Sequence, residues 1–310
     1  MSSAVSYYFE DQELVAVVIG LILAIATAAV IFGGVHRIGI ISSTVVPIMA
    51  LLYIILGLYI TLANVQKLPA IFGMIMEQAF DLKAIMGGFA GSCVMYGIKR
   101  GLFSNEAGMG SAPNAGASAD VSHPVKQGLV QTISVFIDTI LICTTTAFML
   151  LNYGSDANLT GMPYVQQAIS AEVGQAGIHF ITISIFLFAF SSLIGNYCYA
   201  ESNLKFILDT KRSLCIFRIL AIVVIFFGAQ ASFSTIWDLA DVLMGFMAIV
   251  NIIAILLLGK IAITCLKDYS AQKKQGKDPV FDPERLGIAN ADCWKAIVKD
   301  YKEDTSMDDK

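Results

Sequence analysis

Glycines crowd one apolar stretch of the chain, in the run Gly87-Gly88-Phe89-Ala90-Gly91. A glycine inside a helix costs about 1 kcal/mol relative to alanine, so three within five residues favour a locally unwound backbone. In membrane carriers, helices broken near the bilayer midplane expose N–H and C=O groups that bind a substrate carboxylate or coordinate sodium. Gly87 and Gly91 also have the spacing of a close helix–helix contact. The glycines alone leave both interpretations open.

Two adjacent hydroxyls interrupt another apolar run, Phe188-Ala-Phe-Ser-Ser-Leu-Ile-Gly195. Sodium is a hard cation that prefers oxygen ligands, which the hydroxyls of Ser191 and Ser192 and a freed carbonyl could supply. The alternative is that each serine bonds back to a carbonyl one turn earlier in an ordinary helix. This run therefore indicates either a cation site or a local helix contact.

A single carboxylate, Asp138, lies inside a further apolar stretch. The 3.6-residue helical period places it on one face with four other polar residues, namely Gln127, Gln131, Ser134 and Thr145. Because a charge facing lipid is costly, this face must point into the protein or a wet cavity. Gln131 and Asp138 are thus predicted intramembrane polar residues. Asp138 could bind an ion, relay a proton or pair with a donor on a neighbouring helix.

Motifs of the common enzyme classes are missing: the sequence has no GxSxG, HExxH, Walker A or dinucleotide-binding turn. No two cysteines have the spacing of metal ligands, and none of the three histidines is deep in an apolar stretch. We therefore predict a protein that is not an enzyme, holds no cofactor and no metal beyond sodium, and binds no nucleic acid.

Seven apolar stretches must position these residues, and each is about long enough to cross a bilayer. A spanning helix needs about 20 mostly apolar residues. The 56% hydrophobic and 14% charged composition also lies outside the usual range of soluble proteins. The chain is therefore predicted to be an all-α membrane protein with a lipid-embedded domain over residues 14–266. Its predicted spans are 14–33, 45–63, 84–103, 128–151, 178–200, 214–233 and 239–266.

Basic residues gather in alternate loops, which predicts the orientation of the chain. Short loops rich in Lys and Arg stay in the cytoplasm. The basic loops follow the first, third, fifth and seventh spans, whereas residues 1–13 and the loop at 152–177 carry no Lys or Arg. We expect an extracytoplasmic N-terminus (1–13) and a cytoplasmic tail (267–310) in a multi-pass protein of the cell membrane. The tail is charged and polar, and is expected to be a solvated, partly disordered extension.

Several longer motifs resemble those of one family of carriers, the alanine or glycine:cation symporters (sodium:alanine symporters). They are ordered as in that family and extend over about residues 30–260. The matching runs are Gly33-Gly-Val-His-Arg-Ile-Gly39, Gly87-Gly-Phe-Ala-Gly91, Lys99-Arg-Gly-Leu-Phe-Ser-Asn-Glu-Ala-Gly-Met-Gly-Ser-Ala-Pro113, His123-Pro-Val-Lys-Gln-Gly-Leu129, Phe136-Ile-Asp-Thr139, Phe190-Ser-Ser-Leu-Ile-Gly195, Trp237-Asp-Leu-Ala-Asp241 and Gly245-Phe-Met-Ala248.

The resemblance implies a leucine-transporter type of fold, in which two inverted five-helix repeats surround a central site. The second repeat would cover about residues 84–266. Gly88, Phe89 and Gly91 would then bind the substrate, and the Phe188 carbonyl with Ser191 and Ser192 would bind sodium. The family's N-terminal part, with its Gly-Thr-Gly-Asn broken helix and Phe-Trp-Met-Trp signature, has no counterpart in this sequence.

By resemblance, the expected function is sodium-coupled symport of a small neutral amino acid, alanine or glycine, by alternating access. A second hypothesis is a truncated or accessory membrane half-protein with no transport activity alone. Such a half-protein would act only with a separate N-terminal half as its partner.

Overall fold

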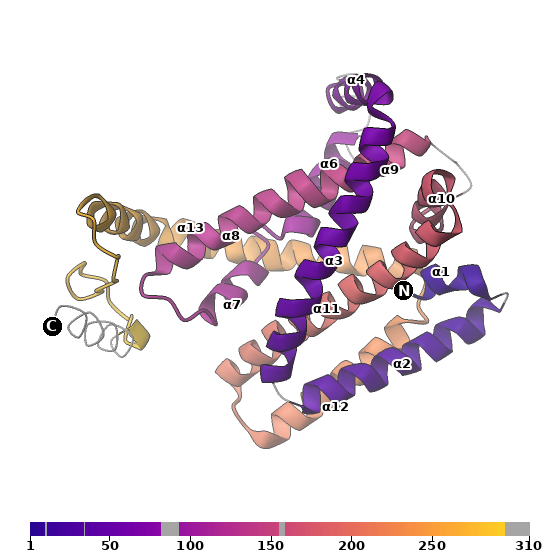
Figure 1. Ribbon diagram of the computed structural model, residues 1–310. Helices are drawn as coiled ribbons and strands as arrows, with labels where there is room; N and C mark the ends of the chain where they lie inside the picture. Colours follow the sequence, from indigo (N-terminus) through magenta and orange to yellow (C-terminus); the bar gives the residue numbers. More distant parts are fainter. Residues whose placement is uncertain (10, 34, 82–92, 155–158, 295–310) are drawn as a thin grey trace. The chain divides into compact units, whose positions relative to one another are not determined.

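The computed structural model describes residues 1–9, 11–33, 35–81, 93–154 and 159–294, and these residues form helices without strands (Figure 1). In chain order the helices are α1 (Ser2–Val5), η1 (Ser6–Tyr8), α2 (Gln12–Phe32), α3 (Val35–Ala63), η2 (Val65–Lys67), α4 (Leu68–Ala79), α6 (Cys93–Asn105), α7 (Ser111–Ala117), α8 (Pro124–Phe136), η4 (Ile137–Cys143), α9 (Thr144–Tyr153), α10 (Met162–Val173), α11 (Gln175–Ile207), α12 (Lys211–Gly228) and α13 (Phe233–Lys274).

Five helices of the described residues are long and apolar enough to cross a membrane. They are Gln12–Phe32, Val46–Ala63, Pro124–Tyr153, Gln175–Ile207 and Phe233–Lys274. The prediction of an all-helical membrane protein is confirmed for the described residues. They contain five helices able to span a membrane, so the predicted number of seven spans is not confirmed.

The other two predicted spans are not among these five helices, for different reasons. Most of the first half of span 84–103 lies outside the described residues, and α6 alone, at 13 residues, is too short. Span 214–233 coincides with α12, an 18-residue helix that carries the three basic residues Lys211, Arg212 and Arg218.

The chain divides into two compact units, which we describe separately. Unit 1 comprises residues 1–104 and 137–241, and unit 2 comprises residues 105–136 and 242–310. The three boundaries fall before the last residue of α6, at the junction of α8 with η4, and inside α13.

Unit 1 is built from tightly packed apolar helices. In Figure 1, α2 lies along α12, and a Cβ atom added at Gly20 would approach the Ala229 Cβ to 3.1 Å. The approach of α3 to α9 is closer still, because a Cβ at Gly57 would lie 1.8 Å from the Thr145 Cγ2. Any larger residue at position 57 would therefore push these helices apart. The buried core beside this contact consists of Tyr53, Ile60, Met149, Ile169 and Ile181.

The fourth predicted span changes its helical geometry midway. Residues Ile137–Cys143 form a π-helix, in which each turn holds an extra residue, and the Thr144 hydroxyl donates to the Thr139 carbonyl at 3.2 Å. Such π segments frequently occur at functional sites. They also rotate all later side chains relative to the earlier ones, so a single 3.6-residue period cannot hold along the span.

A helix that the sequence analysis did not anticipate, α10, occupies the loop between α9 and α11. Its Glu172 carboxylate accepts hydrogen bonds from the side-chain amides of Asn64 (2.9 Å) and Asn152 (2.8 Å). The Tyr164 hydroxyl donates to the Leu150 carbonyl at 3.2 Å. These contacts attach α10 to the ends of α3 and α9.

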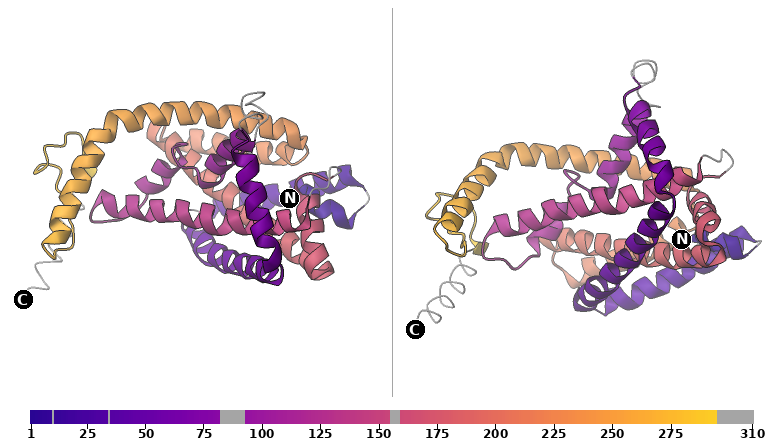
Figure 2. Two further views of the ribbon diagram at one scale, coloured as in Figure 1. Left: turned by 90° about the horizontal axis from the view of Figure 1, so that it is seen from above. Right: turned by 45° about the horizontal axis from the view of Figure 1, so that its top comes forward.

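In unit 2 the chain turns back after α13, as Figure 2 shows. We call residues 275–294 the tail segment. Its Phe281 N–H donates to the Ser122 carbonyl at 2.9 Å, and the Ser122 hydroxyl donates to the Pro279 carbonyl at 2.9 Å. Phe281 is 3% exposed. The expectation of a solvated extension is therefore wrong for this segment, because its apolar side chains pack against the loop before α8.

Candidate functional site

The predicted substrate residues Gly88, Phe89 and Gly91 lie outside the described part of the chain, which omits residues 82–92. The described helix α6 begins directly after them, at Cys93. The hypothesis of an unwound segment at these glycines therefore stays a prediction.

The predicted sodium residues lie in the continuous helix α11. The Ser191 hydroxyl donates to the Phe188 carbonyl at 2.9 Å, which brings two of the three expected oxygens together. This contact is the local back-bond that the alternative interpretation expects. Ser192 is exposed and lies about 100° further around the helix. In this conformation the helix presents the two hydroxyls in different directions.

The surroundings of Phe188 are polar as well as apolar. Its ring packs edge-on against Tyr53, with ring centroids 6.0 Å apart. The Tyr53 and Thr146 hydroxyls are hydrogen-bonded at 2.7 Å, and Thr146 donates to the Ile142 carbonyl at 2.9 Å. The hydrogen-bonded hydroxyls of Tyr53 and Thr146 thus belong to the part of the core against which Phe188 packs.

Asp138 lies half-buried on the π-helical segment. Its Oδ2 accepts a hydrogen bond from the Ser104 hydroxyl of α6 at 2.7 Å, and the Cys143 Sγ is 3.8 Å away. Among the described residues no basic side chain lies within ion-pair distance of Asp138. A carboxylate with hydroxyl and thiol neighbours can accept either a proton or a cation.

The residues of the polar face predicted for this span have different partners. In unit 1, Asp138 meets α6 whereas Thr145 faces Gly57 of α3. In unit 2, the Gln131 amide donates to the Ala112 carbonyl at 2.7 Å. Thr145 lies beyond the π-helical segment, where a uniform 3.6-residue period no longer holds, whereas the shared face of Gln131 and Asp138 stays a prediction.

The motif around Gly108 forms a strained turn in unit 2. Glu106 has φ +54°, and Gly110 has φ +116° with only 3.0 Å between its would-be Cβ and the Met247 Cγ. The positive φ of Gly110 and the short distance from its would-be Cβ to Met247 both favour glycine at this position. The Asn251 amide donates to the Gly108 carbonyl at 3.0 Å, so α13 holds the turn in place.

A buried ionic cluster around Glu201 is not among the predicted site residues. The Glu201 side chain is 4% exposed and lies 2.7 Å from Lys205 and 3.3 Å from Arg218. The Tyr197 hydroxyl donates to its other oxygen. The signal was present in the sequence, because Tyr197, Glu201 and Lys205 are four residues apart on an expected helix.

Another ionic contact joins α6 to the start of α13. Arg100 makes two parallel hydrogen bonds to Asp241 (3.0 and 3.1 Å), and Lys99 adds a third at 3.1 Å. The Arg100 guanidinium also stacks 4.3 Å from the centroid of Trp237. The loop charges assign the basic pair to the cytoplasmic end of one span and Asp241 to the opposite end of another. Because groups on opposite sides of a bilayer cannot lie 3.0–3.1 Å apart, this contact disagrees with the predicted orientation of at least one of these two spans.

The described residues contain no group of three or more His, Cys, Asp or Glu side chains that could hold a metal ion. Their intramembrane polar atoms are instead hydroxyls, carbonyls and single carboxylates. That donor set fits an alkali cation better than a transition metal.

Comparison with known proteins agrees with the motifs. The model of the sodium:alanine symporter family matches residues 1–283. The amino-acid carrier protein AlsT of Bacillus subtilis is 44% identical over 280 residues, which cover 90% of this chain and 60% of that protein. The probable sodium/glutamine symporter GlnT of Bacillus subtilis is 45% identical over 98% of this chain and 64% of its own length.

An archaeal relative is similar as well. The sodium/alanine symporter AgcS of Methanococcus maripaludis is 39% identical over 82% of this chain and 57% of its own length. The chain therefore spans about three fifths of the length of these relatives. They are transporters rather than enzymes, as the missing catalytic motifs predict. The chain belongs to the sodium:alanine symporter family.

Proposed function

We propose that this chain functions in sodium-coupled symport of a small neutral amino acid across the cell membrane by alternating access. The family match over residues 1–283 is the observation that carries the proposal, and the five apolar helices support it. Alanine or glycine is the proposed substrate. Glutamine is a second candidate, favoured by the name of the GlnT relative.

The proposed architecture is the leucine-transporter type, with seven spans and a second inverted repeat over about residues 84–266. The N-terminus is proposed to be extracytoplasmic and the tail cytoplasmic. Gly88, Phe89 and Gly91 would contact the amino acid through main-chain groups.

Sodium would bind the Phe188 carbonyl with the hydroxyls of Ser191 and Ser192. The first two oxygens already lie 2.9 Å apart, so a cation that ligates both would replace their mutual hydrogen bond. Ser192 would have to turn toward them through a local change in α11. A sodium ion that binds only this altered state shifts the equilibrium between states, which is the thermodynamic basis of coupling.

Uptake of radiolabelled alanine into proteoliposomes tests the proposal. We expect uptake to require a sodium gradient, and Ser191→Ala to reduce it about tenfold or more, since one of few sodium ligands is lost. Ser184→Ala is the matched control, because Ser184 is buried in the same helix two turns earlier. Uptake that is indifferent to both sodium and Ser191 would reject the proposal.

The second candidate function is a half-protein that is inactive alone. Co-expression with the part of AlsT that this chain does not match should then restore sodium-dependent uptake that the chain alone lacks. Equal uptake with and without the added half contradicts this candidate.

A further inference from the structure

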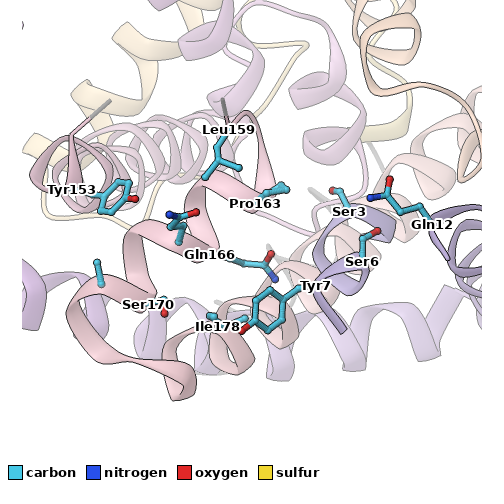
Figure 3. A pocket seen from close by; sticks show the side chains of 12 residues that line it. Ser3, Ser6, Tyr7, Gln12, Tyr153, Leu159, Pro163, Gln166, Ser170 and Ile178 are labelled. Atoms are coloured by element: carbon cyan, nitrogen blue, oxygen red, sulfur yellow. The ribbon is translucent and has the colours of Figure 1, made fainter. Parts of the chain in front are cut away.

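A cavity of about 630 Å³ lies within unit 1, between α10 and residues 3–12, which we call the N-terminal segment. Figure 3 shows Ser3, Ser6 and Gln12 on one side of it, with Pro163 and Gln166 of α10 opposite. Typical small-molecule sites have volumes of about 300–1,000 Å³. This cavity therefore has room for a small solute together with several waters.

The lining of the cavity combines polar and apolar groups and carries no charged side chain. Eight of its twelve lining residues carry a hydroxyl or an amide, and none of the twelve is Asp, Glu, Lys, Arg or His. Hydroxyls and amides both donate and accept hydrogen bonds. A ligand with a net charge would lose its hydration here without meeting an opposite charge, which is costly.

One lining group is fixed in orientation. Gln166 is 3% exposed, and its amide nitrogen donates at 2.8 Å to the Ala4 carbonyl and at 2.8 Å to the Thr182 hydroxyl. Both of its N–H donors are therefore used, and its amide oxygen remains as an acceptor. A fixed acceptor gives the cavity a preferred direction for a ligand N–H group.

Other lining groups are free to adapt. Within the described part of the chain, the side chains of Ser3, Gln12, Gln167 and Ser170 make no hydrogen bond to the protein. They come from both walls, since the first two belong to the N-terminal segment and the other two to α10. A solute between the walls could therefore be contacted from both sides.

We propose that this cavity binds a small solute without net charge that carries amide or hydroxyl groups. None of the twelve lining residues is a predicted sodium or substrate residue, and binding there does not require sodium. The proposal concerns a second binding site, beyond the symport function proposed above.

Equilibrium binding to the purified chain in sodium-free buffer tests the proposal, with L-glutamine and L-glutamate as probes. The two have nearly the same shape, but glutamate replaces the neutral side-chain amide by a carboxylate. We expect L-glutamine to bind at least about tenfold more tightly. Equal affinities, or no glutamine binding, would overturn the proposal.

Gln167→Leu localises the binding. Gln167 is exposed, so its replacement should leave the fold intact, and loss of one hydrogen bond should weaken glutamine binding about fivefold to tenfold. Gln230→Leu is the matched control, because Gln230 is an exposed glutamine after α12 that does not line the cavity. Equal effects of the two variants, or an effect on sodium-dependent binding only, would contradict the assignment.

The two proposals fail independently. Sodium-driven alanine uptake, compared with Ser191→Ala, tests the symport function, whereas sodium-free glutamine binding, compared with Gln167→Leu, tests the cavity. A chain without uptake that still binds glutamine through Gln167 rejects the first proposal and supports the second.

Discussion

Glu201 of unit 1 and Asp268 of unit 2 are both carboxylates largely shielded from solvent, and they have different partners. In unit 1, Glu201 (4% exposed) lies near Lys205 and Arg218 and accepts a hydrogen bond from Tyr197. In unit 2, Asp268 (9% exposed) contacts Arg285 at 2.6 Å, Gln272 at 2.7 Å and His123 at 3.4 Å. Each carboxylate has one short contact to a cation, Glu201 to Lys205 and Asp268 to Arg285. Only the second cluster contains a histidine, the side chain whose ordinary pKa lies near neutral pH.

His123 of unit 2 also makes a hydrogen bond to the backbone of α8. Its Nδ1 accepts a hydrogen bond from the Val125 N–H in the first turn of α8, at 3.2 Å. We assign the proton of the neutral ring to Nε2 on this basis, facing Asp268. At 3.4 Å that contact is longer than a normal hydrogen bond, so the neutral ring is held more firmly by its capping contact than by the carboxylate. The comparison suggests that the Glu201 cluster is permanent and the Asp268 cluster responds to pH.

The largest expected effect is that of Arg218→Leu in unit 1. The change leaves the buried Glu201 charge with Lys205 as its only cation, and we expect unfolding free energy to fall by about 3 kcal/mol. Thermal unfolding of the purified protein in detergent measures the change. Lys211→Leu removes an exposed cation from the start of the same helix and should have little effect. A loss no greater than that of the control would show that the Glu201 cluster contributes little.

Arg285→Leu in the tail segment should have a smaller effect. Arg285 is 52% exposed, so loss of its contact to Asp268 should cost about 1 kcal/mol and loosen the segment. Trp294 reports on this loosening, because its ring lies 5.0 Å from that of Phe281. In a Trp237→Phe background it is the only tryptophan, and its fluorescence should move toward that of exposed indole. Unchanged emission would contradict the contact.

Acidification should also loosen the tail segment. Burial lowers the pKa of His123, opposed by Asp268 and aided by Lys126 and Arg285. The folded state thus takes up the proton less readily than the unfolded chain, whose histidine pKa is about 6.5. The stability contribution is present above that pH and is lost as pH falls below it.

The same Trp294 signal measures the pH effect. The groups that face the ring are Asp268 and Tyr269 of α13, Phe281 and Arg285 of the tail segment and Lys126 of α8. His123→Asn retains a side-chain acceptor for Val125 but cannot titrate near pH 6. Its emission should therefore stay constant between pH 7.5 and 5.5. A transition that persists in this variant would assign the pH response to another group.

Lys126→Ala should have the smallest effect. Lys126 lies 2.7 Å from Asp278, but the Asp278 side chain is 65% exposed. Such surface pairs contribute about 0.5 kcal/mol or less and are screened by salt. We expect a small shift in Trp294 emission that disappears at high salt. A shift as large as that of Arg285→Leu would mean that this pair is more important than its exposure suggests.

Part of the fold and of the candidate site was predictable from local patterns. The apolar stretches at 14–33, 45–63, 128–151, 178–200 and 239–266 coincide with the five helices able to span a membrane. Ser191 and Phe188 meet because residues three apart lie on one helical face. The π-helical segment was not predictable in this way, since nothing in the apolar pattern marks an extra residue in a turn.

The order of residues alone was sufficient to assign the chain to a class and a family. A membrane-spanning chain requires long apolar helices, which are recognised in the sequence as long apolar stretches. The family motifs are recognised directly from their residues. Which polar groups meet was decided by tertiary structure. Asp268 contacts His123, and Asp138 contacts Ser104, although the residues of each pair lie far apart in the sequence and no helical period relates them. Pairs of this kind depend on how the backbone turns and packs, and therefore only the folded chain determines them.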